Sequence, residues 1–203
     1  MTIKEEINNM EYTHLMMIPF TGLGLYGGFR GNRWLRNRIK VFKQFVVPSL
    51  QAQTSQNFKV WVCWRWEERN NKQVVELMAY LESLFPNRVV GTYSGIPFYD
   101  DKYPPDKARV RLLEALHGAT GTLTEHIGDV DNVLMTIQPS DDCYFKDAVA
   151  GIQSTFAQTD FMAFGFSRGY IMNYTTKEVA EYNPKTNPPF YTIKFPRDVF
   201  IDP

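Results

Sequence analysis

Two neighbouring aspartates, Asp141 and Asp142, follow an apolar segment and are the residues of this sequence best suited to bind a metal ion. Successive side chains of a strand point to opposite faces and a buried unpaired carboxylate is costly, so both are expected on a turn at the end of a strand. Mg²⁺ and Mn²⁺ favour one or two carboxylates, completed by waters and by oxygens of a substrate diphosphate. The alternative is that Ser140 or Asp141 caps the helix that follows.

A glycine-rich segment, residues 21–31, is a second candidate site. Glycines after a strand allow backbone N–H groups to approach phosphates at a helix N-terminus. The spacing differs from the dinucleotide fingerprint, and the lysine–serine pair of a phosphate-binding loop is absent, so a lid or a plain connection is the alternative. Arg30, Arg33 and Arg38 are the candidate charged partners of a nucleotide. They belong to a block, residues 30–43, with six basic and no acidic residues, which also fits a solvated helix face.

The remaining polar residues give weaker indications. Asp100 and Asp101 lie in a proline-rich loop, where contact with ribose hydroxyls or a base is the functional interpretation and a solvated loop is the other. The histidines are scattered without ligand spacing, so structural roles are expected for His14, His117 and His126. The two cysteines fit neither a disulfide framework nor a zinc site. No Gly-x-Ser-x-Gly element is present, which leaves nucleophilic hydrolase chemistry with little support.

Composition narrows the class of protein. The 203 residues are 44% hydrophobic, enough for a sizeable core, and the formal net charge is zero, so no overall field attracts nucleic acid. The first ten residues are too polar for a signal peptide, and no apolar run approaches the length of a membrane span. A cytoplasmic protein without a transmembrane segment is therefore expected.

Strands and helices alternate along most of the chain. Buried strands are predicted at 14–20, 59–65, 88–93 and 131–137. Helices are predicted at 74–85, at 107–117 and after Asp147. A further helix is predicted from Asn32, the expected cap, as far as Pro48, which would end or kink it. Residues 160–203 favour shorter, partly antiparallel strands. The pattern predicts one α/β domain over 1–203, with a polar tail at 1–12 and a mainly parallel sheet flanked by helices, carrying a mixed or antiparallel C-terminal addition. Ligands of such sheets bind at the carboxyl ends of the strands, here after Phe20, after Arg65 and at residues 138–145.

Four segments resemble one family of enzymes. Residues 34–38 (WLRNR), 42–54 (FKQFVVPSLQAQT), 58–62 (FKVWV) and 134–142 (LMTIQPSDD) are similar to the rhamnosyltransferase-like glycosyltransferases, in which a helix ending in Pro-Ser-Leu-x-x-Gln-Thr leads into the second strand of a GT-A fold. The family's acidic element is Asp-x-Asp-Asp, and this sequence has Pro139 in place of the first aspartate. The end of its second strand, residues 64–66, lacks the acidic residue often used for the base or ribose.

The resemblance implies transfer of a sugar from a nucleotide-sugar donor to a glycan or other hydroxyl acceptor. It implies Mn²⁺ or Mg²⁺ at Asp141 and Asp142, and contacts with the nucleotide sugar from the first strand and its loop, at Pro19, Phe20 and Thr21. Together with the candidates named above, the predicted nucleotide-sugar-binding residues are Pro19, Phe20, Thr21, Arg30, Arg33, Arg38, Asp100, Asp101 and Ser140. No residue stands out as the catalytic base, and part of the acceptor side is expected to lie beyond residue 203. Two alternatives stay open: a sugar-phosphate nucleotidyltransferase, and a non-catalytic homologue that binds a nucleotide or glycan, which Pro139 favours.

Overall fold

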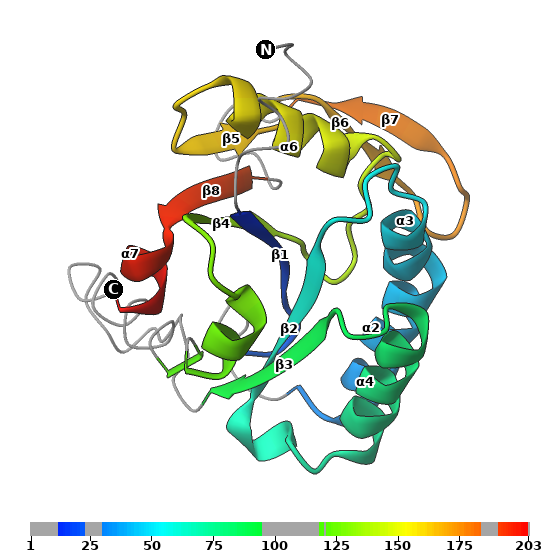
Figure 1. Ribbon diagram of the computed structural model, residues 1–203. Coiled ribbons are helices and arrows are strands. Elements are labelled where there is room, and N and C mark those ends of the chain that lie inside the picture. The colour runs from blue at the N-terminus through cyan, green and yellow to red at the C-terminus, as the bar shows by residue number, and fades with distance from the viewer. Residues whose placement is uncertain (1–11, 23–29, 95–117, 120, 184–190, 203) are drawn as a thin grey trace, which may run out of the picture.

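The computed structural model describes residues 12–22, 30–94, 118–119, 121–183 and 191–202, which form an α/β structure (Figure 1). Its centre is a six-stranded sheet in the order β3-β2-β1-β4-β8-β5. The parallel strands are β1 (Tyr12–Pro19), β2 (Lys59–Arg65), β3 (Val89–Ser94) and β4 (Asn132–Ile137). β8 (Tyr191–Pro196) is antiparallel to both β4 and β5 (Ala163–Gly165), so β8 alone runs against the others. The predicted mainly parallel sheet flanked by helices is confirmed, whereas its assignment to the GT-A fold stays a prediction.

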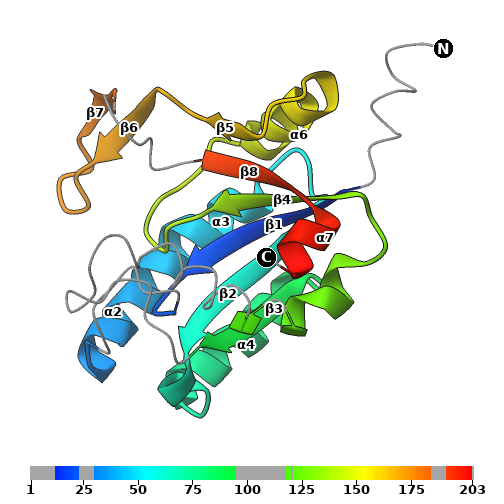
Figure 2. The same ribbon diagram turned by 90° about the vertical axis from the view of Figure 1, so that its left-hand side faces the viewer.

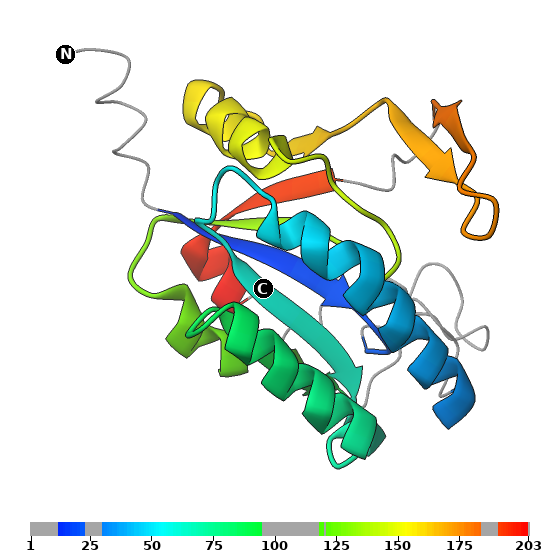
Figure 3. The same cartoon turned by 90° about the vertical axis from the view of Figure 1, so that its right-hand side faces the viewer.

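Alternate residues of the central strands face two separate cores, as the two-residue period of a strand requires. Met16 and Ile18 of β1 pack toward α2 (Asn32–Val41) and α4 (Lys72–Leu84). Leu15 and Met17 pack on the opposite face, toward the helical residues 121–127 and α7 (Arg197–Ile201). Figures 2 and 3 show these two layers on opposite sides of the sheet. Because β1 is buried on both faces, it is apolar along most of its length.

The helix that follows the glycine-rich segment differs from the prediction at both ends. Gly31 occupies the N-cap position with a φ of 87°, and Asn32 is already the first helical residue, so Asn32 is not the cap. At the other end the chain stays helical past Pro48, through the π-helical turn η1 (Phe42–Val46) and α3 (Val47–Gln51). A proline ring clashes with the carbonyl four residues earlier, and a π turn just before Pro48 widens the helix where that carbonyl lies. Pro48 therefore does not end the helix.

The last third of the chain completes the sheet and adds a separate hairpin. α6 (Ala148–Gln158) covers β4 through Ile152 and Phe156, and β5 and β8 then extend the main sheet. β6 (Gly169–Met172) and β7 (Val179–Tyr182) form a two-stranded antiparallel sheet of their own. Figure 2 shows this hairpin standing apart from the main sheet. The antiparallel addition predicted for residues 160–203 is present, but half of it belongs to the central sheet.

A buried chain of polar side chains crosses the sheet at His14, which is 2% exposed. Gln153 of α6 donates from Nε2 to His14 Nδ1 at 3.1 Å, so the ring hydrogen resides on Nε2 and is donated to Thr136 Oγ1 at 2.7 Å. Thr136 Oγ1 in turn lies 2.6 Å from Thr192 Oγ1 of β8. Burial lowers the pKa of His14 to about 3, so the imidazole is neutral in the folded protein. This is the structural role predicted for His14. His117 and the helix predicted over 107–117 lie outside the described residues.

Candidate functional site

The turn after β4 presents the two aspartates at the carboxyl edge of the parallel strands. Gln138 is fully buried, its backbone N–H donates to Met17 O at 2.8 Å, and its side-chain Nε2 donates to Pro139 O at 2.9 Å and to Asp142 O at 2.7 Å. The Gln138 side chain thus closes the turn that holds Asp141 and Asp142. α6 begins only at Ala148, with Asp147 as its N-cap residue, so the alternative that Ser140 or Asp141 caps the next helix is wrong.

Asp141 forms an ion pair with Arg38 of α2. The Arg38 side chain is 15% exposed and its guanidinium lies 5.6 Å from the centre of the Trp34 ring, while the Asp141 side chain is 42% exposed. A partly buried ion pair of this kind fixes the direction of both side chains. The structure therefore joins a residue predicted to contact the nucleotide to a residue predicted to bind metal, and α2 is tied to the turn after β4.

Asp142 lies in a different electrostatic environment from its neighbour. Burial raises the pKa of the Asp142 carboxyl, the charge of Asp141 raises it further, and Arg38 lowers it. A half-buried carboxylate beside a second one is stabilised when a cation binds to it. No group of three His, Cys, Asp or Glu side chains gathers to hold a metal in the described parts of the chain. Asp141 and Asp142 therefore offer at most two carboxylates to a cation, and substrate oxygens and waters would have to complete the coordination of Mg²⁺ or Mn²⁺ there.

A buried glutamate lies at the same edge, after β2. Glu68 ends the short 3₁₀ turn η2 (Trp66–Glu68) and is 2% exposed. Its Oε2 accepts hydrogen bonds from the Thr21 hydroxyl and, at 3.3 Å, from the backbone N–H of Arg65. Burial raises the pKa of Glu68, while the hydrogen bonds from Thr21 and the Arg65 backbone lower it. The sequence does not single out Glu68 as a site residue, because residues 67–71 resemble a solvated polar break. The signal is an acid three residues after the end of β2 at Arg65.

The loop after β1 is packed directly against the end of β2. The N–H groups of Thr21 and Gly22 both donate to Cys63 O, at 3.2 and 3.0 Å. A Cβ atom on Gly22 would lie 2.5 Å from the carbonyl oxygen of Trp64, closer than real Cβ contacts come. Gly22 therefore holds the beginning of the glycine-rich segment against β2 and keeps the Thr21 hydroxyl within reach of Glu68.

Three buried oxygen atoms without a partner among the described residues belong to segments that follow strands at this edge of the sheet. Ser140 Oγ, Gln138 Oε1 and Glu68 Oε1 accept no hydrogen bond from any other described residue. More than nine-tenths of buried polar groups in folded proteins have a partner, so each exception calls for an explanation. These three follow β4 and β2, the two strands that flank β1. Because all three atoms are covered by protein, a water or a ligand group that donates to them has to enter among the residues at this edge.

The other predicted contacts have mixed outcomes. Pro19 is the last residue of β1, and the ring of Phe20 is fully buried, 4.7 Å from the Trp64 ring centre and 5.4 Å from that of Phe42, so its side chain belongs to the core. Arg30 and Arg33 are exposed at the start of α2, with the Arg30 guanidinium 5.8 Å from the Trp34 ring centre. Asp100 and Asp101 lie outside the described residues.

The sequence matches no known protein-family model and no curated protein. None of the helices in the described part of the chain is both long enough and apolar enough to cross a bilayer.

Proposed function

We propose that this protein is a glycosyltransferase that transfers a sugar from a nucleoside-diphosphate donor to an acceptor hydroxyl, with Mn²⁺ or Mg²⁺ at Asp142. The observation that carries the proposal is that Asp141 and Asp142, and the buried Thr21–Glu68 pair, follow the carboxyl ends of three adjacent parallel strands, β4, β1 and β2. Ligands of open α/β sheets bind at this edge. The resemblance of residues 34–62 and 134–142 to rhamnosyltransferase-like enzymes supplies the reaction class.

Glu68 is suited to hold the nucleoside. Its Oε2 is already occupied by Thr21 and the Arg65 N–H, whereas its Oε1 is buried without a described partner. A ribose hydroxyl or a base N–H group donates to such an atom, and a hydrogen bond to a charged acceptor contributes about 1.5–3 kcal/mol. We therefore assign to Glu68 the contact with the base or ribose, since residues 64–66 at the end of β2 include no acid that could make it.

The acidic turn is suited to hold the diphosphate end of the donor. A divalent ion bound there neutralises the charge that develops on the departing diphosphate. Asp142 supplies the carboxylate with the raised pKa, and Asp141, held by Arg38, supplies an oxygen that stays fixed when the donor binds. Gln138 keeps the turn closed through its bond to Asp142 O.

Two other functions are distinguished by their products. A sugar-phosphate nucleotidyltransferase would release pyrophosphate from a nucleoside triphosphate and a sugar phosphate; the glycine-rich loop lacks the Lys-Pro pair of those enzymes, which disfavours this function. A non-catalytic homologue would bind a nucleotide or glycan without turnover, and Pro139 is the residue that favours it.

The test is a thermal-unfolding screen of nucleoside diphosphates and nucleotide sugars, with and without Mn²⁺. A ligand at a hundred times its Kd stabilises the fold by about 2.7 kcal/mol. Asp142→Asn is expected to abolish the Mn²⁺-dependent part of the shift, while Asp147→Asn, an exposed residue 3.5 Å from Lys146, leaves it intact. Glu68→Gln is expected to weaken nucleoside binding about tenfold or more, and the exposed neighbour Glu67 is its control as Glu67→Gln. A screen in which no nucleoside diphosphate stabilises the protein more with Mn²⁺ than without refutes the proposal.

A further inference from the structure

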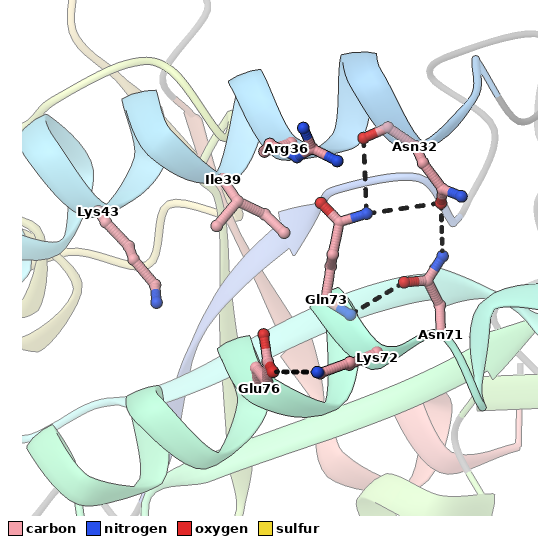
Figure 4. A pocket seen from close by; sticks show the side chains of 8 residues that line it. All are labelled: Asn32, Arg36, Ile39, Lys43, Asn71, Lys72, Gln73 and Glu76. Atoms are coloured by element: carbon pink, nitrogen blue, oxygen red, sulfur yellow. Dashed lines mark hydrogen bonds and ion pairs between the residues drawn. The ribbon is translucent and has the colours of Figure 1, made fainter.

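A groove of about 580 Å³ lies between α2 and α4, on the outer side of these helices (Figure 4). Its volume falls within the range of small-molecule sites, roughly 300–1,000 Å³. Figure 4 shows Ile39 and Lys43 extending toward α4 and Gln73 extending toward α2. The lining consists of Asn32, Arg36, Ile39, Lys43, Asn71, Lys72, Gln73 and Glu76.

Positive charge in this groove exceeds negative charge. Arg36, Lys43 and Lys72 are opposed by a single acid, Glu76, which lies 3.8 Å from Lys72 in a solvent-exposed pair whose side chains are 87% and 61% exposed. Exposed pairs of this kind neutralise each other weakly. Arg36 forms no ion pair with any described residue, and the Lys43 ammonium lies 4.1 Å from the centre of the Tyr80 ring, a cation–π contact that leaves its charge in place.

Amide side chains fix the width of the groove at one end. Asn71 Nδ2 donates to Asn32 Oδ1 at 3.0 Å, and Gln73 Nε2 lies 3.5 Å from both Asn32 O and Asn32 Oδ1. These bonds join the beginning of α2 to the beginning of α4 (Figure 4). The groove is therefore formed before any ligand binds, which lowers the entropic cost of binding. The first turns of both helices contain no acidic residue, so nothing at this end repels an anion.

We propose that the α2–α4 groove binds a phosphate group, carried either by a small phosphorylated molecule or by a phospholipid headgroup. Arg36 offers the planar fork of donors that matches phosphate oxygens, and Lys43 and Lys72 offer compact charges on either side of the groove. Ile39 lies between Arg36 and Lys43 on the same helix and provides an apolar surface for the part of the ligand that carries the phosphate. A neutral or cationic ligand would leave the cations of the groove uncompensated.

This site is separate from the proposed donor site. Arg38, two residues from Arg36, extends to Asp141 at the turn after β4, whereas Arg36 lines the groove. Arg36 and Arg38 thus belong to two different candidate sites, although both are residues of α2. The proposal holds whether or not the chain transfers sugars, because it depends only on residues of α2, η1 and α4 and of the turn before α4.

The test is calorimetric titration of the full chain with inorganic pyrophosphate, without divalent metal and at physiological ionic strength. A second arm measures cosedimentation with phosphatidylcholine vesicles that contain, or lack, phosphatidic acid. Arg36→Gln is expected to weaken binding about tenfold or more, because it removes a charge-assisted pair. Lys40→Gln removes the same charge from the same helix outside the groove, and is expected to change affinity less than about twofold.

Each outcome decides the matter. Pyrophosphate binding that Arg36→Gln weakens and Lys40→Gln spares supports a small phosphorylated ligand. Binding only to vesicles with phosphatidic acid, with the same pattern of variants, supports a headgroup. Failure of both probes to bind, or equal losses from Arg36→Gln and Lys40→Gln, overturns the proposal. Asp142→Asn is not expected to change binding of pyrophosphate or of vesicles, because Asp142 lies outside the groove and no divalent metal is added. Failure of this proposal and failure of the glycosyltransferase proposal are therefore distinguishable.

Discussion

His14 is expected to make the stability of this protein fall steeply between pH 7 and pH 5. Its pKa is about 3 in the folded protein, against an ordinary value of 6.5 that the unfolded chain recovers. Below pH 6.5 the unfolded state therefore binds a proton that the folded state does not bind. A histidine whose folded pKa is lowered stabilises the fold fully above the unfolded pKa, and this stability is lost as the pH falls from 6.5 toward 3.

The magnitude follows from these two values. The contribution of His14 to the free energy of unfolding decreases by about 2 kcal/mol between pH 7 and pH 5, and by about 5 kcal/mol once the pH is below 3. Two kcal/mol is a substantial part of the total stability of a domain, which is about 5–15 kcal/mol. The hydrogen bonds from Gln153 and to Thr136 both belong to the neutral ring, so protonation at Nδ1 also removes the first of them.

Urea unfolding, followed by the fluorescence of the buried Trp61 and Trp64, measures this dependence. His14→Gln is expected to be less stable at pH 7, because the chain of hydrogen bonds is altered, but its stability should decrease by about 2 kcal/mol less than that of the wild type between pH 7 and pH 5. His126→Gln is the matched control, since it removes a histidine that is not fully buried. A His14→Gln variant with the same pH dependence as the wild type would refute the reasoning.

Further predictions concern the site and its supports. Gly22→Ala is expected to lower the free energy of unfolding by about 2 kcal/mol or more, because its Cβ would meet Trp64 backbone atoms. Gly151→Ala, in α6 with open space around it, should instead raise that free energy by up to about 1 kcal/mol. Thermal unfolding of both variants tests the contrast, and equal effects would contradict it. Asp142→Asn is expected to raise stability at pH 7, since the raised pKa of Asp142 means that its charge is costly in the folded state, and the gain should shrink as the pH falls through that pKa. A stability gain that grows toward acid pH would exclude this explanation.

The sheet could be predicted where the sequence is locally consistent. β2 has the bounds predicted for it, Lys59–Arg65, because β-branched and aromatic residues make up most of its interior and it is buried on both faces. Asn32 and Pro48 misled the prediction for the opposite reason. Asn32 is a residue type that often caps helices, but its side-chain oxygen accepts a hydrogen bond from Asn71, the N-cap residue of α4. The clash expected of Pro48 is relieved by a π turn that no local sequence pattern predicts.

The candidate site could be predicted only in part. The acidic turn after β4 is predicted from its residue types and from its position at the end of a strand, the edge at which ligands of such sheets bind. The sequence does not predict the pairing of Arg38 with Asp141, because the two residues are far apart in the sequence and no local pattern links them. Glu68 was missed because its burial depends on Thr21, which follows a different strand. Contacts between residues that follow different strands can be predicted only when the order of the strands in the sheet is known.

The position of β8 determines the order in which this chain can fold. β5 has β8 as its partner in the described sheet, and β8 also covers the edge of β4, so residues 163–165 have no strand to pair with until residues 191–196 have left the ribosome. Synthesis proceeds at about 5–20 residues per second, so β4 presents an open edge for seconds while the hairpin of β6 and β7 is being made. Open edges of this kind pair with other chains. The nascent protein is thus most prone to aggregate in the interval before β8 emerges, and β8 both joins β5 to the described sheet and covers the edge of β4.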